Sequence, residues 1–242
     1  MTRQGATRRS DPAASTALAA VAPAAPTPFR GYFLPEDLAA DRWVHLAGLI
    51  LCTIGIPLLL DEAGHSAGRA VFGACAAYAV TLAILFACST AFYHVPLRVE
   101  RRRLRQLDHA AIFLLIAGTY TPFTATLLPA AEAVATTGLI WLAALCGAIY
   151  KLRRTLAFPG FSTAGYAVIC GTAAVGLAPV LHAVDPASLL LIIGGLVIYG
   201  FGAVVRTRRS LRYRNTIWHG MVVVAASCHY AAILHGVVLS GL

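Results

Sequence analysis

The sequence predicts an all-α membrane protein, built as a bundle of seven transmembrane helices. Of its 242 residues, 59% are hydrophobic and only 12% are charged. A soluble domain carries about 25% charged residues, because its surface must face water. Seven separate apolar stretches are each long enough to cross a hydrocarbon core, which needs about 20 residues. Nearly all basic residues fall in alternate connections between these stretches, a pattern typical of polytopic membrane proteins.

Charges, prolines or glycines bound each apolar stretch, as expected at the ends of helices. The stretches cover approximately residues 43–60, 69–94, 108–128, 133–150, 163–182, 187–205 and 216–239. Glycines are frequent inside them, since small residues let membrane helices approach closely. We therefore expect one membrane domain over residues 36–242. Residues 1–35 are rich in Ala, Pro, Thr and Arg and are expected to form a disordered cytoplasmic tail.

The basic residues predict the orientation of the bundle. Eighteen of the 19 Lys and Arg residues lie in the N-terminal segment or follow the second, fourth or sixth stretch. Because cytoplasmic connections carry such an excess, we expect the N-terminus inside and the C-terminus outside. Arg69 is the exception in the sequence. The net charge of +9 is then a topology signal that also attracts anionic headgroups, and nucleic-acid binding is not expected.

The six cysteines are scattered singly through the apolar runs, and no CxxC pair occurs. This spacing supports neither a disulfide framework nor a cysteine zinc knuckle. We interpret them as small buried apolar residues.

Ionisable side chains at membrane depth are costly, which makes them candidates for function. Five of them fall at the cytoplasmic ends of their stretches: His45, His94, Asp108, His109 and His219. If the second, third and seventh helices are neighbours, these groups converge in one polar pocket. Imidazoles and carboxylates gathered at one depth suit zinc, which takes nitrogen and oxygen ligands. The alternative is that these histidines only meet lipid headgroups.

Helical spacing adds possible partners for two of these histidines. Thr90 precedes His94 by four residues, and Asn215 precedes His219 by four, so each pair shares a helix face. The hydroxyl and the amide are then placed to orient a ligand or to hold a metal-bound water. Asp108 has three open roles, as a ligand, as a general base for that water, or as a helix N-cap.

His229 lies ten residues past His219, about 15 Å deeper in the membrane. We expect it to be a buried, hydrogen-bonded histidine rather than a ligand. His235 lies deeper still toward the outer face, and we assign it no role.

Three segments of the chain resemble the hemolysin III family, which belongs with the progestin and adiponectin receptors. They are STAFYH at residues 89–94, LDHAAIFLLIAGTYTPF at residues 107–123 after an arginine-rich loop, and IWHGMVVVAASCHYAAI at residues 217–233. The resemblance covers about residues 36–238. It implies a seven-helix bundle with a zinc ion near the cytoplasmic side.

In the eukaryotic receptors that this family resembles, a histidine late in the second span and an HxxxH motif in the seventh hold the metal. An aspartate of the third span and a serine of the second lie nearby. His94 matches the second-span ligand, His219 the second histidine of HxxxH, and Asp108 the aspartate. Thr90 takes the serine position and keeps a hydroxyl.

Asn215 stands where the first histidine of HxxxH belongs. An amide oxygen is a weaker ligand for zinc than an imidazole. Zinc binding is therefore expected only if the metal tolerates Asn215 or if Asp108, His109 or His45 replaces the missing ligand.

Two functions follow from the resemblance. The first is a zinc-dependent hydrolase of a membrane lipid, because similar sites in the superfamily are linked to amide hydrolysis of ceramide-like lipids. Asp108 would then accept the proton, and Thr90 or Asn215 would steady the oxyanion.

The second is a non-enzymatic membrane protein, such as a pore-forming cytolysin, a sensor or a regulator of membrane energetics. The nearly uniform apolar character of the spans counts against an open channel. Either function places the protein in the bacterial cytoplasmic (inner) membrane with lipids as partners.

Overall fold

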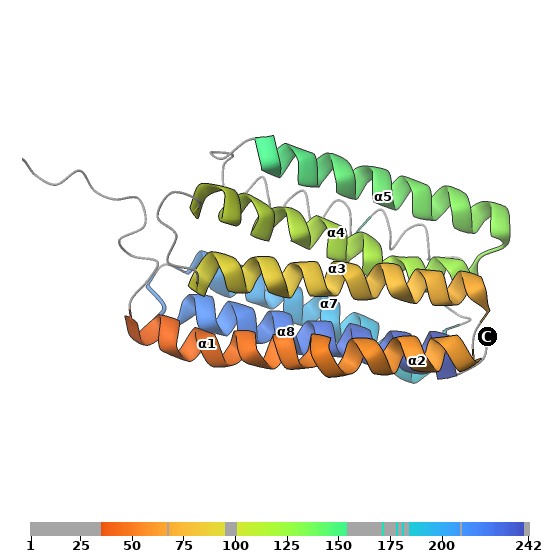
Figure 1. Ribbon diagram of the computed structural model, residues 1–242, viewed down its shortest axis with the longest axis horizontal. Helices are drawn as coiled ribbons and strands as arrows, with labels where there is room; N and C mark the ends of the chain where they lie inside the picture. Colours follow the sequence, from red (N-terminus) through yellow and green to blue (C-terminus); the bar gives the residue numbers. More distant parts are fainter. Residues whose placement is uncertain are drawn as a thin grey trace, which may run out of the picture. The chain divides into compact units, whose positions relative to one another are not determined.

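A computed structural model of the protein describes residues 35–66, 68–94, 101–153, 184–208 and 210–239, together with Gly171, Ala178 and Leu181. The regular structure in these ranges is helical throughout, with no strand among the described residues (Figure 1). The prediction of an all-α protein is therefore confirmed. The tail expected over residues 1–35 lies outside the described residues, apart from Pro35.

The elements, in chain order, are α1 (Pro35–Ile50), η2 (Leu51–Gly55), α2 (Ile56–Ser66), α3 (Arg69–His94), α4 (Arg101–Leu127), α5 (Ala130–Arg153), α7 (Pro186–Thr207), α8 (Arg214–Ile233) and η4 (Leu234–Leu239). η2 and η4 are short π-helices. Six helical segments of the described chain are long and apolar enough to cross a membrane: Leu38–His65, Arg69–His94, Arg102–Leu127, Ala130–Arg153, Pro186–Thr207 and Arg214–Leu239. The further span expected over residues 163–182 lies outside the described ranges, except for Gly171, Ala178 and Leu181.

The helices extend beyond several of the predicted stretches. The first segment runs over Leu38–His65 through α1, η2 and α2, whereas hydropathy alone predicts residues 43–60. The predicted stretch stops where charged residues begin on either side of it, but the helical hydrogen bonding continues past those residues. The same holds for α4, which begins at Arg101 and so places Asp108 two turns inside the helix. The interpretation of Asp108 as an N-cap is therefore wrong.

The π-helix in the first segment has a local cause in the sequence. Pro57 has no backbone N–H and cannot donate to the carbonyl of Thr53, one turn earlier. The helix widens over Leu51–Gly55. At the end of this π-helix the Tyr230 hydroxyl of α8 donates to the carbonyl of Gly55 at 2.7 Å, and this bond joins η2 to α8.

Contacts between helices explain how distant segments of the chain meet. α3 packs against α4, α4 against α5, and α7 against α8, while α1 contacts both α3 and α8 (Figure 1). α4 and α8 touch only slightly. The expected convergence of the second, third and seventh helices therefore depends on α1, which contacts both α3 and α8.

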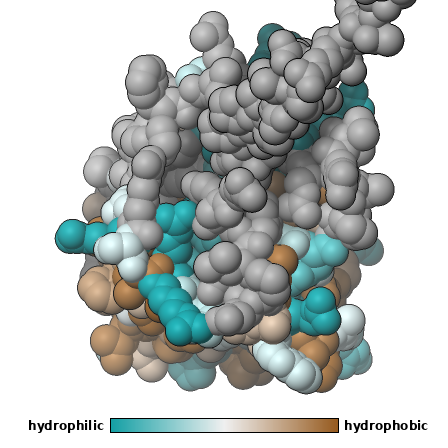
Figure 2. Space-filling model, turned by 90° about the vertical axis from the view of Figure 1, so that its left-hand side faces the viewer, coloured by the Kyte–Doolittle hydropathy of each residue, from teal (hydrophilic) through white to brown (hydrophobic). Residues whose placement is uncertain are grey.

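Apolar side chains cover much of the outside of the bundle. Trp43, Val134, Leu142, Leu190 and Phe201 are all more than half exposed, as expected for surfaces that face lipid. Hydrophilic residues instead gather at one end, where α1, α4 and α8 begin and where α3 and α5 end. Figure 2 views this end and shows hydrophilic side chains beside the apolar rim.

Candidate metal centre

Four ionisable side chains from three helices meet at the end of the bundle where α1 begins. Asp41 and His45 lie one turn apart on α1, His94 ends α3, and His219 lies near the start of α8. Asp41, His45 and His219 are 2%, 3% and 6% exposed, so water solvates little of their polar surface. We call these four residues the Asp41 cluster.

The carboxylate of Asp41 is the centre of the cluster. Its Oδ1 accepts a hydrogen bond of 2.6 Å from Nδ1 of His219. Its Oδ2 lies 3.3 Å from Nδ1 of His45 and 4.0 Å from Nε2 of His94. Oδ2 is buried and has no hydrogen-bond partner among the described residues. A buried carboxylate oxygen without a donor is costly, so this atom marks a place where a cation fits.

Both ring nitrogens of His45 have polar neighbours. Nε2 of His45 lies 3.2 Å from the Ser89 hydroxyl, and Nδ1 lies 2.9 Å from the carbonyl oxygen of Asp41 and 3.3 Å from Nε2 of His94. Because a carbonyl oxygen only accepts, Nδ1 carries the proton and donates to Asp41, while Nε2 accepts from the Ser89 hydroxyl. A metal bound through Nδ1 would require this proton to move to Nε2, which would then donate to Ser89. Histidine ligands are commonly fixed in this way by an acceptor on the other ring nitrogen.

The donor set suits a divalent metal. One ligand atom each from Asp41, His45 and His94 lie within 4.8 Å of one another. Ligand atoms on one tetrahedral zinc are about 3.3 Å apart, given bonds near 2.0 Å, so small side-chain movements bring the three to one ion. Two nitrogens and a carboxylate oxygen are typical zinc ligands. His219 is held by Asp41, and its ring centroid lies 4.6 Å from that of His45.

The residues expected at the site fall into two groups. His94 and His219 both belong to the Asp41 cluster. Asp108 of α4 is 5% exposed and lines a cavity together with His219, and its Oδ2 lies 3.5 Å from Nδ1 of His109. His109 also donates to the carbonyl of Arg105 at 2.8 Å.

Thr90 and Asn215 are both positioned one turn before a histidine of the cluster. Thr90 Oγ1 is buried and makes no hydrogen bond to a described residue. Asn215 is 7% exposed. The structure therefore keeps both side chains in the protein interior, on the helices that carry His94 and His219.

Sequence reasoning missed Asp41 and Ser89. Asp41 precedes His45 by four residues, the same spacing that drew attention to Thr90 and Asn215. Asp41 was passed over because it precedes the apolar stretch predicted to begin at residue 43. Ser89 stands out in the sequence only as part of the STAFYH segment, because the histidine that it contacts is 44 residues away.

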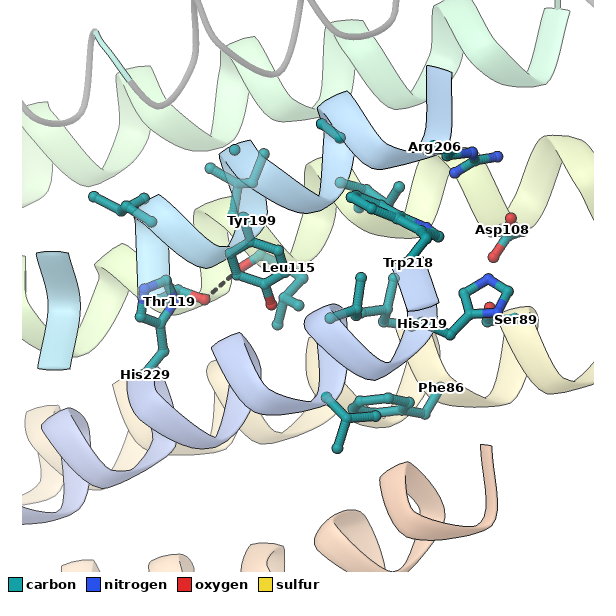
Figure 3. Close-up of a pocket in the computed structure, with 18 of the residues that line it drawn as sticks. Phe86, Ser89, Asp108, Leu115, Thr119, Tyr199, Arg206, Trp218, His219 and His229 are labelled. Atoms are coloured by element: carbon teal, nitrogen blue, oxygen red, sulfur yellow. Dashed lines mark hydrogen bonds between the residues drawn. The ribbon is translucent and has the colours of Figure 1, made fainter. Parts of the chain in front are cut away.

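A cavity of about 510 Å³ extends from the cluster along the inside of the bundle. At one end it is lined by His45, Ser89, Asp108, Arg206 and His219, and at the other by Thr119, Tyr199 and His229 (Figure 3). Apolar side chains form the walls between, among them Phe86, Leu115 and Val222. The buried His229 contacts the carbonyl of Ile192 through Nε2 at 3.2 Å.

A family model and two relatives match most of this chain. The family model described as Haemolysin-III related matches residues 39–230. Hemolysin-3 of Bacillus cereus is 27% identical over 202 residues, which cover 84% of this chain and 92% of that protein. The hemolysin-3 homolog of Bacillus subtilis (strain 168) is 23% identical over 202 residues, covering 84% and 95%. No solved structure matches the chain significantly. The chain belongs to the Haemolysin-III related family, and its apolar helices make it an integral membrane protein.

Proposed function

We propose that the protein is a zinc-dependent hydrolase that cleaves an acyl amide bond of a membrane lipid. The observation that carries this proposal is the position of the Asp41 cluster at one end of a long apolar cavity. A metal-binding donor set beside a space for an acyl chain suits hydrolysis near a lipid headgroup. Neither feature alone would support an enzyme.

The residues of the cluster fit zinc. Oδ2 of Asp41 lacks a hydrogen-bond donor among the described residues, and three imidazoles surround the carboxylate. His45, His94 and His219 would hold the metal, with Asp41 as a further ligand or as the acceptor that orients His219. When bound, zinc polarises a carbonyl and lowers the pKa of water.

The other polar groups of the site have distinct roles in the proposal. Asp108 lines the cavity on the side of His219 and accepts the proton of the attacking water. The buried Thr90 hydroxyl and the Asn215 amide are the donors assigned to the developing oxyanion. Ser89 is a positioning residue, because it acts through His45.

The cavity suits the acyl chain of the substrate. Its volume of about 510 Å³ falls within the range of about 300–1,000 Å³ of ligand sites, and its walls are mostly apolar. An acyl chain in this space removes apolar surface from water, which favours binding. His229, Tyr199 and Thr119 limit the cavity at its far end (Figure 3).

The proposal includes the membrane topology expected from the sequence. Residues 163–182 form a further span, which makes seven with the N-terminus in the cytoplasm. The basic residues at the start of α4 and the ends of α5 and α7 lie at the same end of the bundle as the Asp41 cluster. An excess of Lys and Arg marks the cytoplasmic side, so the site faces the inner leaflet of the bacterial cytoplasmic membrane.

The decisive experiment measures zinc and turnover in the same preparations. Detergent-purified wild-type protein is expected to contain about one zinc per chain and to release fatty acid from a lipid amide. His94→Ala is expected to lose both, whereas His235→Ala, at the other end of the bundle, keeps both. Full turnover by metal-free protein would overturn the proposal. Zinc bound only after Asn215→His would identify a site that has lost its metal.

A non-enzymatic, cytolytic role is the second candidate, and the names of the Bacillus relatives favour it. Pore formation predicts ion flux through liposomes that contain the purified protein, without release of fatty acid. The apolar walls of the cavity count against a water-filled path. Flux that survives His94→Ala would support the cytolytic role over hydrolysis.

A further inference from the structure

The far end of the cavity carries polar side chains, although the walls that lead to it are mostly apolar. His229 of α8 and Thr119 of α4 both line the cavity, and Figure 3 shows them together at the end away from Asp108. Polar atoms inside an apolar space are costly unless they have hydrogen-bond partners. What these two side chains offer to a ligand follows from the bonds that they already make.

His229 uses one ring nitrogen within the protein and leaves the other unused. Its Nε2 lies 3.2 Å from the carbonyl oxygen of Ile192. Because a carbonyl oxygen only accepts, Nε2 carries a proton and donates it, and Nδ1 of the neutral ring then has a lone pair. Among the described residues, none makes a hydrogen bond to Nδ1. His229 is only 6% exposed, so a buried acceptor remains available in the wall of the cavity.

Close packing fixes the position of the His229 ring. A Cβ on Gly195 of α7 would lie 2.5 Å from Nε2, so glycine leaves room for the ring at this point. The ring also contacts that of Tyr199, with centroids 5.6 Å apart and planes at 54°. A polar atom held in one place selects ligands by the position of their matching polar group.

Thr119 adds a hydroxyl that can turn toward a ligand. Its Oγ1 donates to the carbonyl of Leu115 in the same helix at 2.8 Å. Because the hydrogen of a hydroxyl rotates, Thr119 can donate to a ligand oxygen instead. One acceptor and one donor at the same end of the cavity match a hydroxyl group, which both donates and accepts. The methyl end of an ordinary acyl chain matches neither.

We propose that the far end of the cavity binds a hydroxyl group at the end of a lipid acyl chain. The inference rests on the proposed function, which places the cleaved carbonyl at the Asp41 cluster. His229 lies about 15 Å along α8 from His219 of that cluster, and an extended chain of about twelve carbons spans this distance. The favoured acyl group is therefore an ω-hydroxyacyl chain of about this length, whose methylene groups lie against the apolar walls.

Competition between free fatty acids measures this preference without requiring turnover. Detergent-purified protein is loaded with labelled dodecanoic acid, which is then displaced by dodecanoic acid, ω-hydroxydodecanoic acid or dodecanoic acid hydroxylated at mid-chain. The ω-hydroxy acid is expected to bind about tenfold more tightly than dodecanoic acid, because two hydrogen bonds form at the end of the chain. The mid-chain hydroxy acid is expected to bind more weakly than dodecanoic acid, since its hydroxyl lies among apolar side chains. All three acids have the same carboxylate and the same chain length.

Matched variants separate the two polar side chains from the rest of the cavity. His229→Gln keeps a donor for the Ile192 carbonyl but no acceptor at the position of Nδ1, and is expected to reduce the preference to less than about twofold. Thr119→Val is expected to reduce it to about threefold. Thr126→Val is the control, because Thr126 also donates to a carbonyl of α4 at 2.8 Å but does not line the cavity. Detergent takes up each acid equally in all variants, so a change in preference reports the protein.

The outcomes distinguish this inference from the proposed function. Equal affinities of the wild type for the ω-hydroxy and unsubstituted acids would overturn the inference, as would a full preference in His229→Gln. If His229→Gln does not fold, the two threonine variants decide, and equal preferences in them would overturn it. Turnover of a lipid amide by protein without this preference leaves the proposed function standing. A preference shown by protein without zinc or turnover would overturn only the proposed function.

Discussion

The two ends of the bundle each hold an aspartate beside a histidine from the last helical segment, but the two sites differ in burial. At the end opposite the Asp41 cluster, Asp185, Ser188 and His235 form what we call the Asp185 cluster. Nδ1 of His235 lies 3.3 Å from the Ser188 hydroxyl and 3.5 Å from Oδ2 of Asp185. The His235 side chain is 57% exposed, whereas that of His219 is 8% exposed.

The difference shows that residue types alone do not identify a site. Asp185 is the N-cap of α7, where its Oδ1 accepts a hydrogen bond of 2.9 Å from the backbone N–H of Ser188. Water reaches the His235 side chain, and this cluster links η4 to the start of α7. Oδ2 of Asp185, like Oδ2 of Asp41, is buried and has no hydrogen-bond partner among the described residues, so the two clusters differ in their histidines. Three imidazoles surround Asp41 instead, and two of them, those of His45 and His219, are buried. Among the described residues, only Asp41, His45 and His94 form a group of three ligands that could hold a metal ion.

Replacing each aspartate by asparagine gives the largest expected contrast. Asp41→Asn is expected to lower zinc affinity about 100-fold, because a neutral amide binds zinc weakly and no longer orients His219. Asp185→Asn is expected to change zinc affinity less than about twofold, since an exposed cap does not touch the metal. Competition with a chelating dye measures both affinities. Similar zinc affinities for the two variants would remove the distinction between the clusters.

The two serines provide a second contrast, with a smaller effect. Ser89→Ala removes the hydroxyl that contacts Nε2 of His45 and is expected to lower zinc affinity about tenfold, as losses of such outer partners do. Ser188→Ala removes a hydroxyl of equal size from the Asp185 cluster and is expected to leave zinc affinity unchanged. The same dye competition measures both. An unchanged affinity in Ser89→Ala would show that His45 needs no fixed tautomer.

Hydropathy predicted much of the fold because membrane helices need long apolar runs. The stretch at residues 69–94 coincides with α3 at both ends, since Arg69 and His94 mark the change in polarity. The first helix was predicted too short, because Asp41 and Arg42 continue the helix although they are charged. Hydropathy detects where a helix enters lipid, and hydrogen bonding decides where the helix ends.

The site was harder to predict than the fold. His94 and His219 stood out because they are ionisable residues at membrane depth in matching family segments. Asp41 is separated by 178 residues from the histidine to which it bonds, and nothing local in the sequence indicates that α1 contacts both α3 and α8. Tertiary packing brings these residues together, so spacing along one helix could suggest pairs but not the cluster.

Gly236 and Gly220 of the last helical segment lie at opposite ends of the bundle and differ in how closely other atoms pack against them. A Cβ on Gly236 would lie 2.5 Å from the Ser188 hydroxyl and 3.1 Å from Oδ2 of Asp185, whereas a Cβ on Gly220 would meet no described atom within 4 Å beyond its chain neighbours and the backbone of its own helix. Gly236→Ala is therefore expected to destabilise the protein by about 1–2 kcal/mol. Gly220→Ala is expected to be neutral or slightly stabilising. Thermal unfolding in detergent measures the stability of both variants. Equal melting temperatures would mean that Ser188 and Asp185 move aside to accommodate the added methyl group without lowering the stability of the protein.

The smallest expected effect is a dependence of stability on pH at the Asp185 cluster. Hydrogen bonds from the side chain and the backbone N–H of Ser188 lower the pKa of Asp185 below its usual value. A carboxyl whose pKa is lower in the folded state stabilises the protein above its unfolded pKa of about 3.9. That contribution is lost as the pH falls through the folded pKa, because the unfolded chain then no longer binds more protons than the folded one.

Asp185→Asn isolates this contribution, because asparagine also caps helices well but does not titrate. The wild type is expected to melt at a higher temperature than Asp185→Asn from pH 7 down to about pH 5. The difference should shrink below about pH 4, while the zinc content of the two proteins stays equal at neutral pH. A difference that grew on acidification would mean that protonated His235, rather than the Ser188 hydrogen bonds, controls Asp185. The cluster would then respond to pH through its histidine, and exposure would no longer separate it from the Asp41 cluster.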